Sequence, residues 1–244
     1  LMQVVGMRPI VVHGGGPQIG ELLERLNIES KFIDGMRVTN EETMDVVEMV
    51  LGGQVNKEIV NLLNLAGGRA MGITGKDGRF IRARQLKIER KSPELEAPEI
   101  IDIGHVGQVE SIDTRVLTML TENNVIPVVA PIGAGPNGES YNINADTAAG
   151  AIARSIKSRR LMLLTDIDGV LDNNNKLISE INTMQAKELI NNETIHGGMI
   201  PKIKTCIDAI NNGVRAVVIL DGRKPHSILF ELFSDKGSGT LIRK

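Results

Sequence analysis

Three consecutive glycines separate a strand-like run from a helix-like run near the start of the chain. Residues 9–13 (PIVVH) are of the kind that fills a parallel strand, and apolar residues recur at helical spacing after Pro17. Gly14, Gly15 and Gly16 therefore form a strand-to-helix loop whose backbone N–H groups lie near the positive end of a helix dipole. Because glycine has no Cβ, an anionic ligand could approach this backbone closely. The pattern fits a cradle for an anion and fits a tight turn equally well.

Polar side chains stand at alternate positions in the segment NINAD. In an extended backbone Asn142, Asn144 and Asp146 would all point the same way. Asn144 could instead cap the helix that begins near Ala145, which would place Asp146 in the first turn of that helix. Both interpretations stay open from the sequence.

Charged residues in three glycine-bearing segments complete the candidate set. Lys202 (in GGMIPK) lies in the first turn or so of a helix, where the dipole disfavours a cation unless an anion is bound there. Arg37 (in GMRVT) could form a two-pronged contact with a carboxylate. Thr165, Asp166 and Asp168 (in LLTDIDG) could bind a nucleotide, or Mg²⁺ indirectly. Taken singly, each of these residues is more commonly a solvated surface residue.

The composition disfavours several other classes of function. The 244 residues carry 28 Lys and Arg against 30 Asp and Glu, a net charge of −2, so no broad basic field is available for a nucleic acid. Aromatic residues make up only 2%, which disfavours stacking on bases. The one cysteine, Cys206, fits a reducing compartment such as the cytoplasm, or a plastid stroma in a photosynthetic eukaryote. No apolar run reaches ~18 residues, so we expect no membrane span.

The elements that must position these residues alternate between strand and helix, which predicts a mainly parallel sheet with helices on both faces. Ligands of such sheets bind at the carboxyl ends of strands, where loops 14–16, 133–146, 165–169 and 196–202 would converge. Neither the GxxxxGK[ST] nor the GxGxxG nucleotide motif follows the first strand.

Local signals define a long helix and the start of another. Thr39 and Glu42 predict a capping box that opens a helix through Leu65, weakened at residues 52–53. Asp113 is expected to cap a later helix.

Three short strands are expected between these helices. The first spans residues 70–74, and the turn at residues 76–78 predicts a hairpin to a second at 79–83. A third strand is expected at 86–89, and residues 92–99 read as a polar, exposed loop.

Five segments in this order resemble the acetylglutamate kinases of the amino-acid kinase family: VVHGGGPQI, GMRVT, NINADTAA, LLTDIDGV and GGMIPK. The resemblance covers essentially the entire chain. It implies an α/β fold, a three-layer αβα sandwich with a mainly parallel open sheet, in two lobes. The first lobe, residues 1–157, would bind N-acetyl-L-glutamate, and the second, residues 158–244, would bind ATP with Mg²⁺ held through the nucleotide.

The reaction implied by the resemblance is phosphorylation of the side-chain carboxylate of N-acetyl-L-glutamate. The product would be N-acetyl-L-glutamyl 5-phosphate, the second intermediate of arginine biosynthesis. A Glu side chain has a reference pKa of about 4.3, so the nucleophile is already ionised at neutral pH and needs no general base. Catalysis should then consist of positioning, positive charge and N–H donors.

The resemblance also implies a role for each candidate residue. Lys202 would stabilise the transferring charge, and Asp146 would position catalytic lysines. The substrate would be held by Gly15, Gly16, Arg37 and Asn142, with Arg37 on its α-carboxylate. The nucleotide would contact Gly14, Thr165, Asp166, Gly169, Leu171, Thr194 and His196, and no protein-bound metal site is expected.

The tail DGRKPHSILFELFSDKGSGTLI resembles the arginine-inhibited branch of the family. His226, Glu231, Gly237 and Gly239 match the pattern associated with binding of L-arginine. The resemblance implies a homodimer, a hexamer in arginine-sensitive members and, in some photosynthetic relatives, a PII-type signalling partner.

One family feature is missing from the sequence. The family begins with a strand that ends in Lys-(Tyr/Phe)-Gly-Gly, and no such motif occurs here. We therefore expect a fragment of a longer gene product, which without that lysine could lose roughly 10²–10³ in rate or be inactive. The alternatives are a carbamate, glutamate 5- or aspartate kinase, or a non-catalytic module that binds arginine or a nucleotide.

Overall fold

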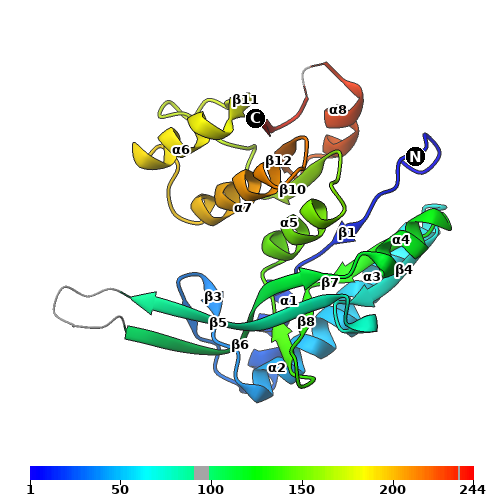
Figure 1. The fold of residues 1–244 in the computed structure, drawn as a ribbon, viewed down its shortest axis with the longest axis vertical. Helices are drawn as coiled ribbons and strands as arrows, with labels where there is room; N and C mark the ends of the chain where they lie inside the picture. Colours follow the sequence, from blue (N-terminus) through cyan, green and yellow to red (C-terminus); the bar gives the residue numbers. More distant parts are fainter. Residues whose placement is uncertain (91–98, 236) are drawn as a thin grey trace. The chain divides into compact units, whose positions relative to one another are not determined.

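Two compact units make up the structure, a computed structural model that describes residues 1–90, 99–235 and 237–244 (Figure 1). The first unit spans Leu1–Ala148 and the second Ala149–Lys244.

The first unit carries a three-stranded parallel sheet of order β1-β7-β4 and a small closed barrel of β5, β6, β9 and β8. Its strands are β1 (Val11–Val12), β2 (Phe32–Ile33), β3 (Met36–Arg37), β4 (Ala70–Thr74), β5 (Ile81–Arg90), β6 (Glu99–Ile112), β7 (Ile126–Ala130), β8 (Ile132–Ala134) and β9 (Ser140–Asn142). Its helices are α1 (Gly16–Arg25), α2 (Glu41–Glu48), the π-helix η1 (Met49–Val55), α3 (Asn56–Leu65), the 3₁₀-helix η2 (Asp77–Arg79), α4 (Arg115–Glu122) and the start of α5 (Ala145–Ser155). One core cluster joins α1, α2 and η1, with Leu23, Val47 and Val50 fully buried or nearly so.

A helical stretch from Glu41 to Leu65 is confirmed, but its cap differs from the one expected. Asn40 is the N-cap, and its side chain accepts a hydrogen bond from Thr43 N at 2.8 Å. The capping box on Thr39 is wrong because that side chain is fully buried and bonded elsewhere. The expected weak point at residues 52–53 lies inside η1, where the wider π turn interrupts the α-helix.

The predicted hairpin after β4 is also wrong. β4 pairs in parallel with β7, whereas β5 pairs with β6 and β8 in the barrel. Residues 77–79 form η2 instead, with Lys76 as its N-cap and Gly78 at φ 60°. The two short strands expected at 79–83 and 86–89 are one strand, β5, because its antiparallel pairing with β6 continues along both. Most of the expected polar loop at 92–99 lies outside the described residues.

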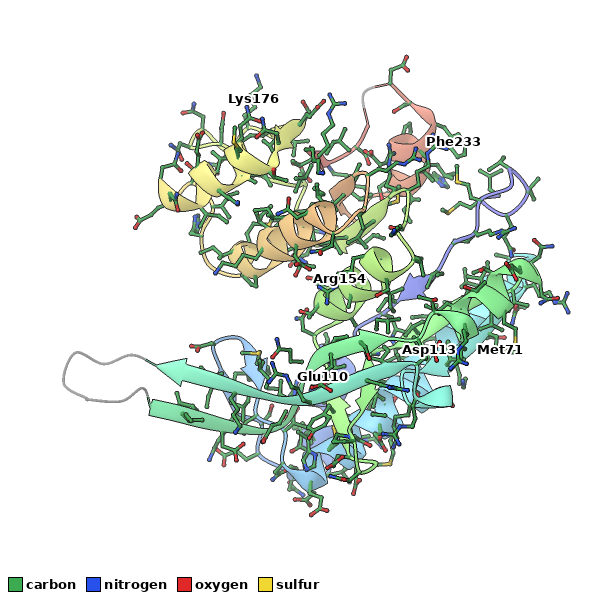
Figure 2. The ribbon with its side chains drawn as sticks, in the orientation of Figure 1. Met71, Glu110, Asp113, Arg154, Lys176 and Phe233 are labelled. Atoms are coloured by element: carbon green, nitrogen blue, oxygen red, sulfur yellow. The ribbon has the colours of Figure 1, made fainter. Side chains whose placement is uncertain are left out.

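The Asp113 side chain caps the start of α4, as expected, from the position before the N-cap residue. Thr114 is the N-cap residue, and the Asp113 carboxylate accepts from Arg115 N at 3.1 Å and binds the Arg115 guanidinium (Asp113 is labelled in Figure 2). This pairing lowers the pKa of Asp113 to about 2.

The second unit is a mixed four-stranded sheet of order β10-β12-β13-β11 covered by helices. Its elements are β10 (Leu161–Thr165), β11 (Glu180–Asn182), α6 (Thr183–Asn191), α7 (Met199–Asn211), β12 (Val217–Asp221), α8 (Ser227–Phe233) and β13 (Thr240–Arg243). β10 and β12 run parallel, and α7 lies against β12 and β13 (Figure 1). The apolar face of α7, with Ile203 and Ile210, packs on Val217 and Ile219 in one core.

The compact units divide inside α5, between Ala148 and Ala149, whereas the sequence placed the boundary after Lys157. Ala149 and Ala153, both on the part of α5 that follows this division, pack on the core of the second unit. Within the described parts of the chain, no helix is both long and apolar enough to cross a membrane.

The corrected cap predicts how two neighbouring surface substitutions differ. Asn40→Ala should lower the free energy of unfolding by about 1 kcal/mol, because it removes the side-chain acceptor of α2. Glu42→Ala should change it by no more than about 0.5 kcal/mol, since Glu42 is exposed and closes no capping box. Urea unfolding of the two variants measures the difference. A larger loss of unfolding free energy in Glu42→Ala than in Asn40→Ala would contradict the corrected cap and favour the capping box.

Candidate active site

The glycine loop joins β1 to α1 and leaves the start of α1 uncapped by any side chain. Gly15 is the N-cap, Gly16 begins the helix, and Ile19 N donates to Gly15 O at 2.9 Å. N–H groups in a first helical turn have no acceptor within the helix. Gly14 and Gly16 are exposed, so the loop can offer these donors to an anion.

Packing explains why position 15 is a glycine, but it does not explain why position 16 is one. A Cβ at Gly15 would lie 2.6 Å from Leu51 Cδ2 and 3.3 Å from Val55 Cγ2, both on η1. Around Gly16 a Cβ would meet nothing within 4 Å. Contact with η1 therefore requires glycine at position 15, whereas nothing inside the protein requires it at position 16.

Arg37 holds its positive charge beside this loop. Its Nη2 donates to Gly16 O at 3.1 Å, its Nη1 donates to Ser30 Oγ, and its guanidinium carbon lies 4.6 Å from the centroid of the Phe32 ring. Partial burial lowers the pKa of Arg37, but a guanidinium stays charged at neutral pH. The fixed guanidinium can bind a carboxylate next to the loop.

Thr39 links Arg37 to Asn142. Its Oγ1 donates to Arg37 O at 2.8 Å, and Asn142 Nδ2 donates to the same hydroxyl at 3.4 Å. Gly104 has φ +71°, and a Cβ there would lie 2.2 Å from Thr39 O, so the backbone of β6 closes tightly on this threonine. We missed Thr39 as a site-building residue because its type and place before a helix also suit a cap.

Asp146 lies in the first turn of α5, next to the glycine loop. Asn144 Oδ1 accepts from Thr147 N at 3.1 Å, which confirms the capping interpretation of this asparagine. A Cβ at Gly14 would lie 3.8 Å from Ala145 Cβ. The first unit therefore brings together the glycine loop, Arg37, Asn142 and the turn that carries Asp146.

In the second unit, charged residues gather where β10 and β12 end. Thr165 pairs with Asp221 in the register of these parallel strands. Thr165 Oγ1 donates to Asp166 Oδ1 at 3.2 Å, and Lys224 Nζ lies 2.8 Å from Asp168 Oδ1.

Asp221 forms a two-pronged pair with Arg223, with Nε–Oδ1 and Nη2–Oδ2 distances of 2.9 Å each. These hydrogen bonds lower the pKa of Asp221 to about 2. Asp221, Arg223 and Lys224 were not predicted as site residues, although their place directly at the end of an apolar strand was a usable signal.

Two candidate nucleotide contacts shape the loop after β10. Gly169 has φ +147°, and a Cβ there would lie 2.6 Å from Thr240 Oγ1, which accepts from Val170 N at 2.8 Å. Leu171 forms an isolated bridge with Leu177.

The other three nucleotide and catalytic candidates flank the start of α7. Thr194 N donates to Asn192 Oδ1 at 3.1 Å, and His196 O accepts from Met199 N at 3.3 Å. Lys202 is the fourth residue of α7, which has Gly198 as its N-cap and no capping side chain. The predicted place of Lys202 near a helix start, after a glycine loop, is confirmed.

The tail residues surround a buried carboxylate. Glu231 is 9% exposed, its Oε2 accepts from Ser238 N at 3.0 Å, and Arg160 Nη1 donates to its Oε1 at 3.4 Å. Gly237 has φ +65°, and a Cβ there would lie 2.7 Å from Glu231 Oε2.

The other two tail candidates lie at the ends of this segment. His226 precedes α8 with φ 61° and is exposed. A Cβ at Gly239 would lie 2.1 Å from Ile219 O.

Comparison with known proteins places the chain in a family. The sequence model of the amino acid kinase family matches residues 2–221, so the chain belongs to this family and the α/β fold expected from the resemblance is confirmed. It is 60% identical to the acetylglutamate kinase of Marinobacter nauticus over 244 residues, 100% of this chain and 84% of that protein. It is 58% identical to the acetylglutamate kinase of Stutzerimonas stutzeri over 99% of this chain and 81% of that protein.

A solved structure of N-acetylglutamate synthase from Neisseria gonorrhoeae, complexed with coenzyme A and N-acetyl-glutamate, has the same fold. Its TM-score is 0.84 at 24% identity, over 99% of this chain and 53% of that one.

The two loop glycines predict different outcomes when each is replaced by alanine. Gly15→Ala should lower the free energy of unfolding by about 1–3 kcal/mol, because its Cβ collides with Leu51. The displaced loop should cost on the order of 10² in kcat/KM. Gly16→Ala should leave the free energy of unfolding undiminished and still lower kcat/KM roughly tenfold or more, because its Cβ points into the open side of the loop.

Chemical unfolding and steady-state kinetics of both variants check this prediction. Full activity in Gly16→Ala would contradict a ligand at the loop, and equal stabilities would contradict the packing account of Gly15.

Proposed function

We propose that the protein transfers the γ-phosphoryl group of ATP to the side-chain carboxylate of N-acetyl-L-glutamate, as an acetylglutamate kinase of arginine biosynthesis. One observation carries this proposal: identity of 58–60% to two acetylglutamate kinases over 99–100% of the chain. The geometry of the first unit supports it, because a fixed guanidinium lies beside a loop of backbone donors.

The first unit would bind the amino-acid substrate. The Arg37 guanidinium takes the α-carboxylate, and Asn142, held through Thr39, makes a further contact. The N–H groups of Gly15 and Gly16 donate to the reacting oxygens. The exposed backbone at Gly14 and Gly16 supports this arrangement.

The chemical difficulty of the reaction is electrostatic. An ionised carboxylate must approach a phosphate that is itself negative, so the site has to supply positive charge and N–H donors at the point of transfer. Lys202 supplies positive charge to the transferring phosphoryl group, and Asp146 orients a lysine. The site needs no general base, because the nucleophile is already ionised.

ATP would bind the second unit at the loops that follow β10 and precede α7. The contacts within this unit are the residues already assigned there, Thr165, Asp166, Gly169, Leu171, Thr194 and His196. Among the residues that the structure describes, no cluster of three or more His, Cys, Asp or Glu side chains could hold a metal ion. As the resemblance implies, Mg²⁺ would enter with the nucleotide, which supplies its phosphate oxygens as ligands.

L-Arginine would act as a feedback inhibitor at the tail. The Glu231 carboxylate, which lies 3.4 Å from the Arg160 guanidinium, is the kind of group to which the guanidinium of L-arginine would bind. The same tail segment contains the other three candidates, His226, Gly237 and Gly239.

A homodimer would form through an apolar surface of the first unit. Leu62, Leu65, Met71 and Met119 on α3, β4 and α4 are all at least 49% exposed (Met71 is labelled in Figure 2). A second copy of the chain would remove these side chains from water.

Trapping the product with hydroxylamine tests the proposed reaction. Purified protein with ATP, Mg²⁺ and N-acetyl-L-glutamate should form the hydroxamate, with kcat/KM far above that for glutamate, aspartate or carbamate. Another preferred acceptor would overturn the substrate assignment, and ligand binding without turnover would point to a non-catalytic module.

Two lysines on α7 provide a matched pair for the catalytic assignment. Lys202→Ala should lower kcat about 10²–10³-fold, because it removes a cation that stabilises charge in the transition state. Lys204→Ala, two residues further along α7 and exposed, should leave kcat unchanged. Equal losses in both variants would contradict the role of Lys202.

A further inference from the structure

We propose that His13 and Asn56 are positioning residues that fix the peptide between Gly14 and Gly15, so that the Gly15 N–H faces the reacting groups. This inference rests on the proposed function, since it concerns the donors of the same loop. It assigns a task to two buried polar residues for which the proposed reaction otherwise has no use.

A chain of hydrogen bonds runs from α3 to the glycine loop. Asn56, the first residue of α3, is fully buried, and its Nδ2 lies 3.1 Å from His13 Nε2 and 2.9 Å from Val128 O. His13 is 7% exposed, and its Nδ1 lies 2.8 Å from Gly14 O. The contacts cross 43 and 72 residues of sequence, so they form only in the folded unit.

The contacts of the two ends of the Asn56 amide fix which groups donate and which accept in this series of hydrogen bonds. Lys57 Nζ, which can only donate, lies 3.1 Å from Asn56 Oδ1, and Val128 O, which can only accept, faces Nδ2. The Asn56 amide therefore donates to His13 Nε2, which must be unprotonated. The proton of the neutral ring lies on Nδ1 and is donated to Gly14 O.

The direction of the Gly14 carbonyl decides where the next N–H points. A trans peptide places its C=O and N–H on opposite sides. Because His13 draws the Gly14 oxygen toward itself, the Gly15 N–H points away from the imidazole. Gly14 and Gly16, on either side, are exposed, so this donor lies on the accessible part of the loop.

The surrounding residues hold the network in this arrangement. A Cβ at Gly72 would lie 1.8 Å from Asn56 Oδ1, so glycine is required where β4 passes this side chain. The π-helix η1 ends directly before Asn56 and also packs Leu51 against Gly15. Burial lowers the pKa of His13, which keeps the imidazole neutral at neutral pH as the hydrogen-bond chain requires.

Two isosteric substitutions separate positioning from simple packing. The side-chain nitrogen of asparagine can take the place of Nδ1 as the donor to Gly14 O, whereas the side-chain oxygen of glutamine reaches the place of Nε2 and can accept from Asn56 Nδ2. His13→Asn should keep the bond to Gly14 O and retain kcat within about threefold. His13→Gln should lose it and lower kcat by about 10²–10³-fold, as loss of a transition-state donor does.

Three further measurements accompany this pair of variants. The midpoint temperature of thermal unfolding should fall by a similar amount in both variants, because each loses one buried hydrogen bond. Asn64→Ala, which removes the 2.7 Å bond to Ala70 N at the other end of α3, should lower stability and leave kcat unchanged. Nitrogen-15 spectra of the wild-type imidazole should show a neutral His13 with its proton on Nδ1.

The outcomes distinguish this inference from the function on which it rests. If the wild type phosphorylates N-acetyl-L-glutamate and both His13 variants lose kcat equally, the positioning role is overturned and the function stands. A proton on Nε2 of the wild-type ring would overturn it as well. If the wild type does not phosphorylate N-acetyl-L-glutamate, the proposed function fails, and the positioning role fails with it.

Discussion

Repulsion between two anions sets the requirements for a site that phosphorylates a carboxylate. The nucleophile is already reactive, so the protein has to bring it to a phosphate and offset the negative charge that accumulates between them. Side-chain cations are long and mobile, whereas backbone N–H groups at a helix start are short and fixed. The loop of Gly14, Gly15 and Gly16 provides such fixed donors, and Arg37 provides the adjacent charge.

Much of the first unit serves to keep that loop in place. The π-helix η1 packs Leu51 and Val55 on Gly15, and it delivers Asn56 to the ring of His13. Thr39 performs the corresponding task for Arg37 and Asn142, and Gly104 lets β6 close on it. These supporting side chains are buried, which favours fixed directions for the donors while a ligand binds.

The sequence predicted contacts between neighbours and missed those between distant residues. The glycine loop, Asn144 as a cap and the place of Lys202 follow from residue types within a few positions, and all three are confirmed. Thr39 and Asn40 can both cap a helix, and only the burial of Thr39 against β6 decides between them. The hairpin failed because β4 finds its partner, β7, more than fifty residues further along the chain. Nothing local to Asn56 indicates that it faces His13.

The central claim is that the substrate carboxylate itself attacks phosphorus, and an oxygen-isotope experiment tests it most directly. N-Acetyl-L-glutamate labelled with ¹⁸O in its side-chain carboxylate is incubated with the protein, ATP, Mg²⁺ and hydroxylamine. Attack by the carboxylate forms a C–¹⁸O–P bridge and releases ADP, and hydroxylamine then displaces phosphate from the carbonyl carbon. The account predicts that phosphorus-31 spectra show one ¹⁸O in each released phosphate. Phosphate without the label would mean that water, and not the substrate, attacks ATP, and would contradict the account.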